Sequence, residues 1–291
     1  MRYVIMDLEW NNVYVKRLKG YINEIIEVGA VMLDESLTEI NSFSCLVKSQ
    51  LRRKLSARVE ELTHLTNDEL NSSGITFQNA MDQFSDWLQD PKDIIFMTWG
   101  NGDIRSLLDN YRLFMQTETI PFLHYYIDLQ SYCQGMVASQ TTNQVGLSAA
   151  AEKIGIDLSQ FHNHRALDDS ILAAECLRRT FDSEKIERYT DTCDDSFFRR
   201  LLFKTVLLTD LDDPKIDKAL FRCRCDHCGK NMDLFSDWFS TKNGFRSVFV
   251  CHDCRIYKRC TIRFVELTGG MDIKISYRIA HELTEAENDK A

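Results

Sequence analysis

The 291-residue sequence predicts a mixed α/β domain followed by a small metal-binding domain. Short apolar runs typical of buried strands alternate with helical spacing of apolar residues over the first part of the chain. Two Cys-x-x-Cys pairs stand close together after the character of the sequence changes at about residue 216. We therefore expect an α/β domain over 1–182, a helical linker over 183–215, a metal-binding domain over 216–278 and an acidic tail over 279–291.

The expected elements follow from the spacing of apolar residues. Strands are expected where short apolar runs meet charged residues or turns, at 3–6, 24–33, 39–47, 93–99 and 125–129. Helices are expected where apolar residues recur every three or four positions or follow a turn, at 76–88, from Asp103 onward, at 147–154 and at 170–181. Apolar residues at 197–208 indicate helices that cover or bridge domains, and 245–250 alternates as a strand does.

Composition excludes several classes of protein. With 44% hydrophobic residues, 3 Pro and 12 Gly, the chain is neither a disordered nor a collagen-like polymer. No run of eighteen apolar residues is present to span a membrane, and the start, MRYVIMDLEW, is too short and too charged for a signal peptide. Ten cysteines without an export signal indicate a reducing cytoplasm, where metal ligation or free thiols are expected rather than disulfides.

Charge is distributed unevenly along the chain. The net charge is −9, but residues 1–215 hold 22 Lys and Arg against 33 Asp and Glu, a net of −11. Residues 216–278 hold 12 against 7, a net of +5. An acidic front part suits a carboxylate-rich site for divalent cations, whereas a mildly basic stretch suits contact with phosphates.

Acidic residues stand at the ends of two predicted strands. Asp7 and Glu9 end the first strand and point to the same face of it, where their mutual repulsion favours a bound cation. The alternative is a solvated strand end. Asp103 follows the strand at 93–99 and the turn Gly100-Asn101-Gly102, and its alternative role is that of a helix N-cap.

His164 precedes two aspartates at the start of another predicted helix. In one continuous helix, the i, i+4 spacing would place His164 and Asp168 on one face. If His164 instead lies in the loop before the helix, that relation does not hold. Spacing alone does not choose between Asp168 and Asp169, and a capped helix with a surface histidine is the alternative to a functional site.

The order of these residues resembles the DEDDh exonucleases, a branch of the ribonuclease-H-like 3′–5′ exonucleases. That family has Asp-x-Glu on its first strand, an Asp after a central strand and His-x-x-x-x-Asp. The matching residues here are Asp7, Glu9, Asp103, His164 and Asp169, so the resemblance selects Asp169. Supporting segments are 24–31, 146–148, 153–156 and Leu-Thr-His-Leu-Thr at 62–66, the last most like the histone-mRNA and small-RNA exonucleases. The resemblance covers about 1–182 and implies a ribonuclease-H-like mixed sheet flanked by helices.

The resemblance implies a metal-dependent 3′–5′ exonuclease that converts single-stranded nucleic acid into nucleoside 5′-monophosphates. Asp7, Glu9, Asp103 and Asp169 would hold two Mg²⁺ or Mn²⁺ ions, and His164 would accept the proton of the attacking water. The substrate would be a single-stranded 3′ end, with RNA slightly favoured over DNA. Other functions left open are a proofreading DNA exonuclease that accompanies a polymerase, and a non-catalytic adaptor that binds nucleic acid or protein.

Two further residues are expected to contact the substrate. Where the family often has a Thr after Asp-x-Glu, this chain has Trp10, which would either stack on a terminal base or pack in the core. Leu65, within the 62–66 segment, is the other.

Two cysteine pairs predict a zinc ribbon. Cys225 and Cys228 form one pair, Cys251 and Cys254 the other, with 22 residues between the pairs. Four thiolates from two such turns suit one structural, tetrahedral Zn²⁺. The nearby alternatives to one of these four ligands are Cys223, Cys260, His227 and His252. Basic and aromatic side chains around the ribbon suit contact with nucleic acid, and docking of a protein partner is the alternative.

Overall fold

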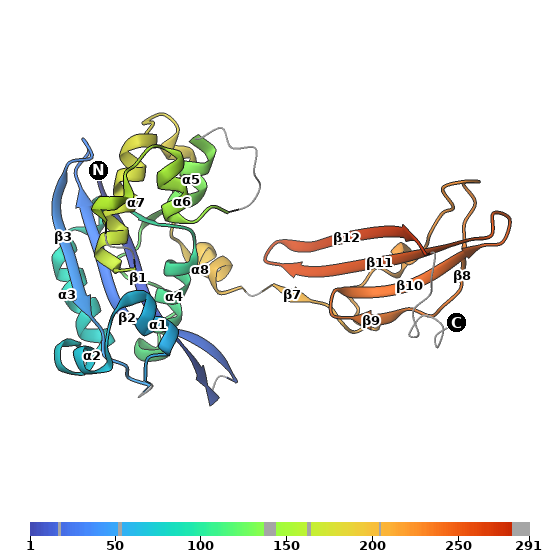
Figure 1. Ribbon diagram of the computed structural model, residues 1–291, viewed down its shortest axis with the longest axis horizontal. Helices are drawn as coiled ribbons and strands as arrows, with labels where there is room; N and C mark the ends of the chain where they lie inside the picture. Colours follow the sequence, from blue (N-terminus) through green and yellow to red (C-terminus); the bar gives the residue numbers. More distant parts are fainter. Residues whose placement is uncertain (17–18, 52–53, 137–143, 162–163, 204, 281–291) are drawn as a thin grey trace. The chain divides into compact units, whose positions relative to one another are not determined.

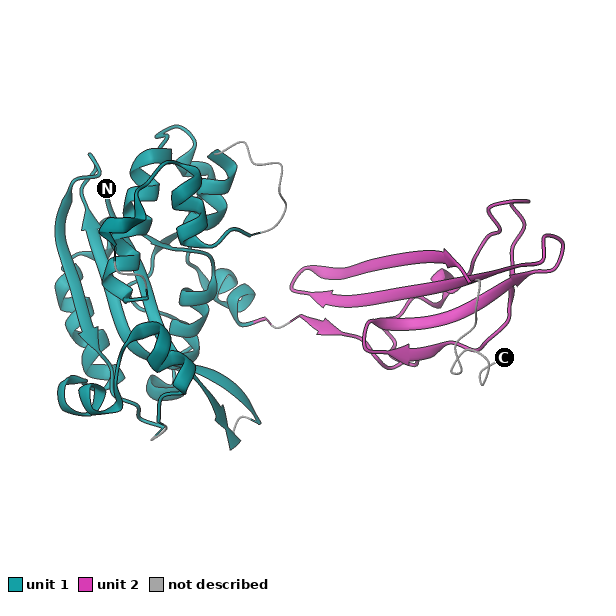
Figure 2. Ribbon diagram, in the orientation of Figure 1, with its two compact units in different colours: residues 1–202 teal, residues 203–291 magenta. Residues whose placement is uncertain are grey.

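The computed structural model describes residues 1–280 apart from 17–18, 52–53, 137–143, 162–163 and 204 (Figure 1). It divides into two compact units, residues 1–202 and 203–291 (Figure 2). The division falls inside the segment expected to be a helical linker, because helix α8 (Asp195–Leu202) buries Phe197 and Phe198 in the core of the first unit. No helix in the described part of the chain is long and apolar enough to cross a membrane.

A six-stranded mixed sheet, ordered β3-β2-β1-β4-β5-β6, forms the centre of the first unit. Its strands are β1 (Arg2–Val15), β2 (Gly20–Leu33), β3 (Glu39–Leu46), β4 (Ile94–Thr98), β5 (Tyr125–Asp128) and β6 (Asp191–Thr192). β1, β4 and β5 run parallel, whereas β2, β3 and β6 pair antiparallel with their neighbours. β1 pairs with β4 only as far as Ile5, so the carboxyl end of β4 lies beside the middle of β1. Ligands bind beyond the carboxyl ends of parallel strands in open α/β sheets.

Helices cover both faces of this sheet (Figure 1). They are α1 (Ala57–Thr63), α2 (Asn67–Ser73), α3 (Phe77–Leu88), α4 (Gly102–Asn110), α5 (Leu129–Met136), α6 (Leu147–Lys153) and α7 (Ala166–Thr180). Short helical turns lie at η2 (Pro91–Asp93), η3 (Tyr111–Met115), η4 (Leu158–Gln160) and η5 (Ile186–Tyr189). Successive β1 side chains point to opposite faces, so Val4 and Met6 pack with α3 and α4, while Ile5 packs with α5, α6 and α7.

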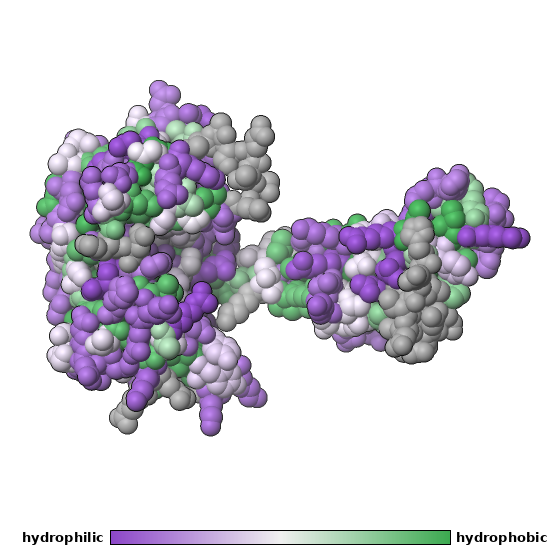
Figure 3. Space-filling model, in the orientation of Figure 1, coloured by the Kyte–Doolittle hydropathy of each residue, from purple (hydrophilic) through white to green (hydrophobic). Residues whose placement is uncertain are grey.

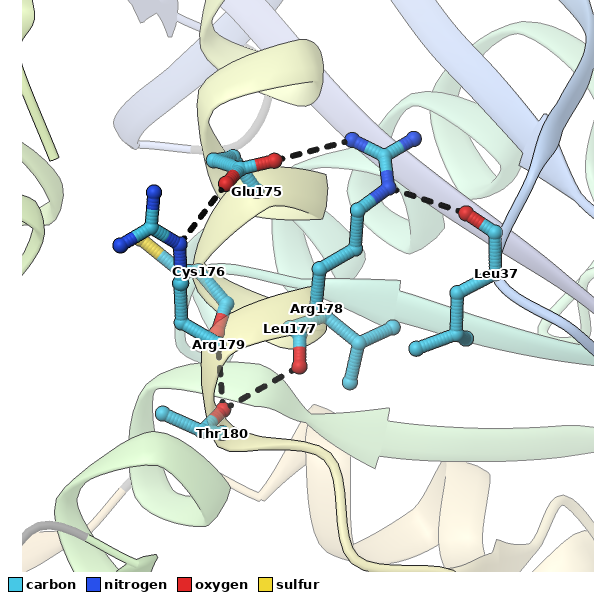
Figure 4. A network of polar contacts seen from close by, with 7 residues as sticks. All are labelled: Leu37, Glu175, Cys176, Leu177, Arg178, Arg179 and Thr180. Carbon is cyan, nitrogen blue, oxygen red and sulfur yellow. Dashed lines mark hydrogen bonds and ion pairs between the residues drawn. The ribbon is translucent and has the colours of Figure 1, made fainter.

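Polar contacts anchor the carboxyl end of α7 to the turn between β2 and β3 (Figure 4). The Arg178 Nε donates to the Leu37 carbonyl oxygen at 2.9 Å. Glu175 accepts from the guanidinium groups of both Arg178, at 3.3 Å, and Arg179, at 3.1 Å. The far end of the helix that carries Asp169 in its first turn is thus held to the sheet.

β1 is much longer than the apolar run 3–6 suggests. It pairs with β2 from Tyr3 to Val15, with one irregularity at Glu9 and Trp10. Polar residues from Asp7 to Asn12 break the apolar pattern, although the backbone pairing continues through them. The added length forms a hairpin that extends past the helices of the unit (Figure 1).

The second unit is a sheet of antiparallel strands. These are β7 (Val206–Leu207), β8 (Asp233–Leu234), β9 (Phe239–Thr241), β10 (Gly244–Cys251), β11 (Ile256–Leu267) and β12 (Gly270–Ile279), with η6 (Lys218–Leu220) before them. Phe245, Phe249, Ile262 and Phe264 centre its core. The alternating segment 245–250 lies in β10, as expected. Polar side chains cover most of the visible surface of each unit, with apolar patches between them (Figure 3).

Candidate active site

A pocket of about 540 Å³ lies where β4 ends beside the middle of β1. Asp7 and Glu9 thus lie within β1 and not at its end, which corrects the prediction, because pairing with β2 continues the strand to Val15. The pocket gathers all the carboxylates and the histidine that the sequence predicted. Its lining residues are Asp7, Leu8, Glu9, Trp10, Trp99, Asp103, Gly146, Leu147, Ser148, Ala149, His164 and Asp169. One ligand atom from each of Glu9, His164 and Asp169 lies within 4.8 Å of the others. Segments far apart in the sequence therefore form one site.

Asp103 is hydrogen-bonded directly to β1. Asp103 lies in the first turn of α4, where it is nearly fully buried. Its Oδ1 accepts a hydrogen bond from the backbone N–H of Leu8 at 3.3 Å. Because Leu8 stands between Asp7 and Glu9, this bond ties Asp103 to the strand that carries both. The N-cap position is held by Asn101, so Asp103 is not the helix cap.

The start of α7 rests on β2 directly beside Asp7. Gly29 is the cross-strand partner of Asp7, and a Cβ at Gly29 would lie 2.1 Å from the carbonyl carbon of Ala166. Only glycine permits this close approach. Two residue pairs along, Glu27 is buried opposite Glu9 and receives a forked ion pair from Arg165, with its shortest contact at 2.8 Å.

Glu27, Arg165 and Gly29 are positioning residues that the sequence analysis missed. Glu27 Oε2 also accepts from the Ala166 backbone N–H at 3.3 Å, so it holds the first turn of α7. The available signal was a carboxylate in the middle of the apolar run 24–33, since a buried acid requires a partner.

Replacing Gly29 with Ala is expected to destabilise the first unit and to lower activity together. The added methyl group meets the α7 backbone, and overpacking of this kind costs about 1–3 kcal/mol. Asp169 must move with the helix, so we expect hydrolysis to fall by at least about tenfold. Thermal melts and steady-state kinetics measure both effects. Gly146→Ala is the control for stability, because a Cβ there meets nothing within 4 Å; equal melting temperatures for the two variants would contradict the packing argument.

His164 lies in the loop before α7, not in the helix. Its φ is 66°, in the left-handed region, and α7 begins at Ala166. The backbone N–H of His164 donates to Asp169 Oδ2 at 3.1 Å. The helical i, i+4 relation between His164 and Asp168 therefore does not apply, and Asp169, rather than Asp168, lines the pocket.

Burial, together with mutual repulsion, raises the pKa values of the carboxylates in the pocket. Burial, followed by the neighbouring Asp103 and Asp169, raises the pKa of Asp7 well above its usual range. Burial and the charge of Asp169 raise the pKa of Glu9 to about 8, and burial raises that of Asp103 to about 7. The pKa of Asp169 is raised as well, again mainly by burial. Such a donor set of hard oxygens fits divalent cations, whose charge would allow all the acids to ionise.

Divalent cations are expected to stabilise the protein more at pH 8 than at pH 6. The pKa of Glu9 rises from 4.5 to about 8 on folding. Without metal, the folded state therefore retains a proton that the unfolded chain releases, and its stability falls as pH rises from about 4.5 to 8. A bound cation offsets this loss. Thermal melts with Mg²⁺ or Mn²⁺, against Na⁺ at matched ionic strength, measure the gain; a gain independent of pH would contradict the carboxylate cluster.

Four cysteine sulfurs gather in the second unit. The Sγ atoms of Cys225, Cys228, Cys251 and Cys254 all lie within 4.8 Å of one another. A tetrahedral Zn²⁺ with bonds of about 2.3 Å spaces its sulfurs about 3.8 Å apart. Cys228 and Cys251, whose sulfurs are 3.6 Å apart, meet that requirement. The backbone N–H groups of Cys228 and His227 hold the pKa of Cys225 down to about 6, which favours the thiolate that a metal needs.

The alternative zinc ligands lie elsewhere in the second unit. Cys223 and Cys260 are buried in the apolar core. His227 is exposed, and His252 is exposed beside Asp233, with His252 Nε2 3.5 Å from Asp233 Oδ2. The donors that converge are thus the four cysteines of the two Cys-x-x-Cys turns.

The sequence of the first unit matches a known protein family. The family model described as Exonuclease (RNase_T) matches residues 4–177, more than half of the chain. This chain belongs to the exonuclease family. It is 26% identical over 202 residues to the DNA polymerase III PolC-type of Thermotoga petrophila, an alignment that covers 66% of this chain and 13% of that protein. The chain thus corresponds to only a small part of these curated relatives.

Solved exonucleases share the fold. The nuclease domain of 3′hExo, a DEDDh family member bound to rAMP, superimposes with a TM-score of 0.54 and 22% identity, covering 64% of this chain and 92% of that one. A 3′-exonuclease that recognises the 3′ end of the histone mRNA stem-loop gives 0.53 and 22%, covering 61% and 62%. The predicted DEDDh resemblance and the ribonuclease-H-like sheet of this exonuclease are therefore confirmed.

The two predicted substrate contacts differ in their placement. Trp10 lines the pocket and also packs against the core, so its core packing is observed and its stacking on a base stays a prediction. Leu65 is fully buried in a cluster with Ile26, Leu55 and Leu70. It has no surface to offer a substrate, which corrects the prediction: the 62–66 segment packs this side chain inward.

Proposed function

We propose that this exonuclease removes nucleotides one at a time from the 3′ end of single-stranded nucleic acid, with divalent cations, and releases nucleoside 5′-monophosphates. The convergence of Asp7, Glu9, Asp103, His164 and Asp169 in one pocket is the observation that carries the proposal. These residue types in one site supply both cation ligands and a proton acceptor.

Each group has a chemical role in the proposal. The carboxylates of Asp7, Glu9, Asp103 and Asp169 would hold two ions, either Mg²⁺ or Mn²⁺, which would supply Lewis acidity to the attacking water and to the leaving 3′ oxygen. His164 is exposed at the pocket, next to Asp169, and its imidazole accepts the proton of the attacking water. Trp10 stacks on the terminal base, a contact that tolerates any sequence.

RNA is the proposed preferred substrate, because one structural neighbour recognises the 3′ end of a histone mRNA. The PolC relatives favour a second candidate, a proofreading DNA exonuclease that co-purifies with a polymerase. A non-catalytic adaptor is disfavoured by the complete set of carboxylates and His164.

We further propose a cytoplasmic location and one structural Zn²⁺ held by the four gathered cysteines of the second unit.

The test compares 5′-labelled single-stranded RNA, single-stranded DNA and duplexes of each, with Mg²⁺, Mn²⁺ or EDTA. The expected result is a ladder that shortens by single nucleotides from the 3′ end, only with metal, and faster on RNA. Faster shortening of DNA would favour the proofreading function. A folded protein that leaves every substrate intact with either ion would refute the enzymatic proposal.

A further inference from the structure

Two exposed aromatic side chains end the hairpin that continues from the active-site strand. Tyr14 on β1 and Tyr21 on β2 are cross-strand partners, with ring centroids 5.3 Å apart. They are 45% and 70% exposed, so they add little to the core of the unit. Exposed tyrosines of this kind are typical of surfaces that bind another molecule.

A second hollow lies along the same strand. It has a volume of about 270 Å³ and is lined by Asn11, Asn12, Val13, Tyr14, Lys54 and Ser56. The active-site pocket is lined by β1 as far as Trp10, and the second hollow starts at the next residue. One continuous strand therefore borders both hollows.

Buried polar side chains hold the other wall of this hollow in place. The nearly fully buried Asn11 donates from Nδ2 to the Lys54 carbonyl oxygen at 3.1 Å and accepts at Oδ1 from the Ser56 N–H at 3.3 Å. Glu24 is buried on β2 and accepts three hydrogen bonds from residues 49–51, which lie shortly before Lys54 in the chain. Their donors are Ser49 Oγ at 2.8 Å, Gln50 N at 2.7 Å and Leu51 N at 2.9 Å. Residues 49–51, 54 and 56 are thus fixed against the base of the hairpin.

These two segments are basic in an otherwise acidic unit. Residues 10–23 contain three Lys and Arg and no acidic residue, and residues 48–58 contain five and none. The chain to residue 215 nevertheless has a net charge of −11. Among the described side chains, Lys16, Lys19 and Lys54 are exposed on the hairpin and loop. A polyanion would find attraction here and repulsion over most of the rest of the unit.

We propose that the described residues of the β1–β2 hairpin, together with residues 48–51 and 54–56, bind the single-stranded nucleic acid on the 5′ side of the nucleotide being removed. The lysines contact its phosphates, and Tyr14 and Tyr21 stack on its bases. Glu9 and Tyr14 are five residues apart, roughly 17 Å along a strand. Stacked nucleotides rise about 3.4 Å each, so the groove holds about five of them. The inference rests on the proposed 3′–5′ activity and extends it to substrate length.

The kinetic test uses two variants of the full chain, Tyr14→Ala with Tyr21→Ala, and Lys16→Gln with Lys19→Gln and Lys54→Gln. Substrates are a dinucleotide and a single strand of about ten nucleotides. For the longer strand we expect KM to rise by about tenfold or more in each variant. In the tyrosine variant, the reason is that each lost stacking contact is worth about 1–3 kcal/mol. For the dinucleotide, kcat/KM stays unchanged. The matched charge control is Lys92→Gln with Arg188→Gln and Arg199→Gln, exposed cations that line neither hollow.

Binding of the longer strand in EDTA tests the groove without hydrolysis. Each phosphate contact contributes about 0.7 to the slope of log K against log salt, so the lysine variant should lose about 2 from that slope. The groove is refuted if the lysine variant matches the charge control in both assays while wild type degrades the strand. If wild type hydrolyses nothing, the proposed activity fails, and the slope alone decides whether the groove binds nucleic acid.

Discussion

Asp7→Asn is expected to abolish hydrolysis and leave the protein folded. Asp7 is half-buried in the pocket, where desolvation, followed by the charges of Asp103 and Asp169, raises its pKa. The amide keeps the shape of the side chain and removes the negative charge that two cations need. Loss of several kcal/mol of electrostatic stabilisation corresponds to a rate reduction of about a thousandfold or more. Without metal, one fewer acid in the pocket should leave the melting temperature unchanged or raise it.

Asp168→Asn is the matched control for this variant. Asp168 is in the first turn of α7 beside Asp169 but does not line the pocket. It should therefore keep nearly wild-type activity. Single-turnover assays with Mg²⁺ and with Mn²⁺, together with isothermal titration of the cation, separate chemistry from metal binding. Full activity in Asp7→Asn, or equal losses of activity in both variants, would contradict the assignment of the site.

The site residues could be predicted from sequence because their chemistry is visible in their type. Asp7 and Glu9 are acids two residues apart directly after an apolar run, and the resemblance to the DEDDh family selected Asp169 over Asp168. The contacts that position them could not be predicted. Gly29 matters through the backbone of Ala166, and no pattern within the run 24–33 shows which helix will lie on it.

β1 was predicted too short because its pairing with β2 is not visible in local periodicity. Local periodicity reports one face of one element, whereas strand pairing depends on a partner elsewhere in the chain. The polar residues of β1 after Asp7 hid its continuation to Val15, which is stabilised by pairing with β2. β11 and β12 were not predicted, although the alternation of apolar and polar residues from Ile273 to Ile279 is typical of a strand. β12 is an edge strand, and its Ile273, Ile275 and Ile279 remain exposed.

Cys251→Ser is expected to unfold the second unit while the first keeps its activity on a dinucleotide. Structural Zn²⁺ contributes about 10–16 kcal/mol to folding in small zinc domains, more than the core of so small a unit can replace. Every residue that lines the active-site pocket belongs to the first unit, so loss of the zinc site leaves the pocket intact. Zinc content, limited proteolysis and dinucleotide hydrolysis measure the three consequences.

Cys223→Ser distinguishes a zinc ligand from an ordinary buried thiol. Cys223 lies two residues before Cys225 and is buried with its sulfur against Met232, outside the gathered cysteines. We expect this variant to keep its zinc and to lose only the modest stability of one altered core contact, whereas Cys251→Ser loses the ion. Zinc retained by Cys251→Ser, or lost by Cys223→Ser, would mean that a different set of donors holds the metal. Because chelation acts on all donors alike, it should reproduce the Cys251→Ser phenotype whichever cysteines are the ligands, so the two serine variants carry the decision.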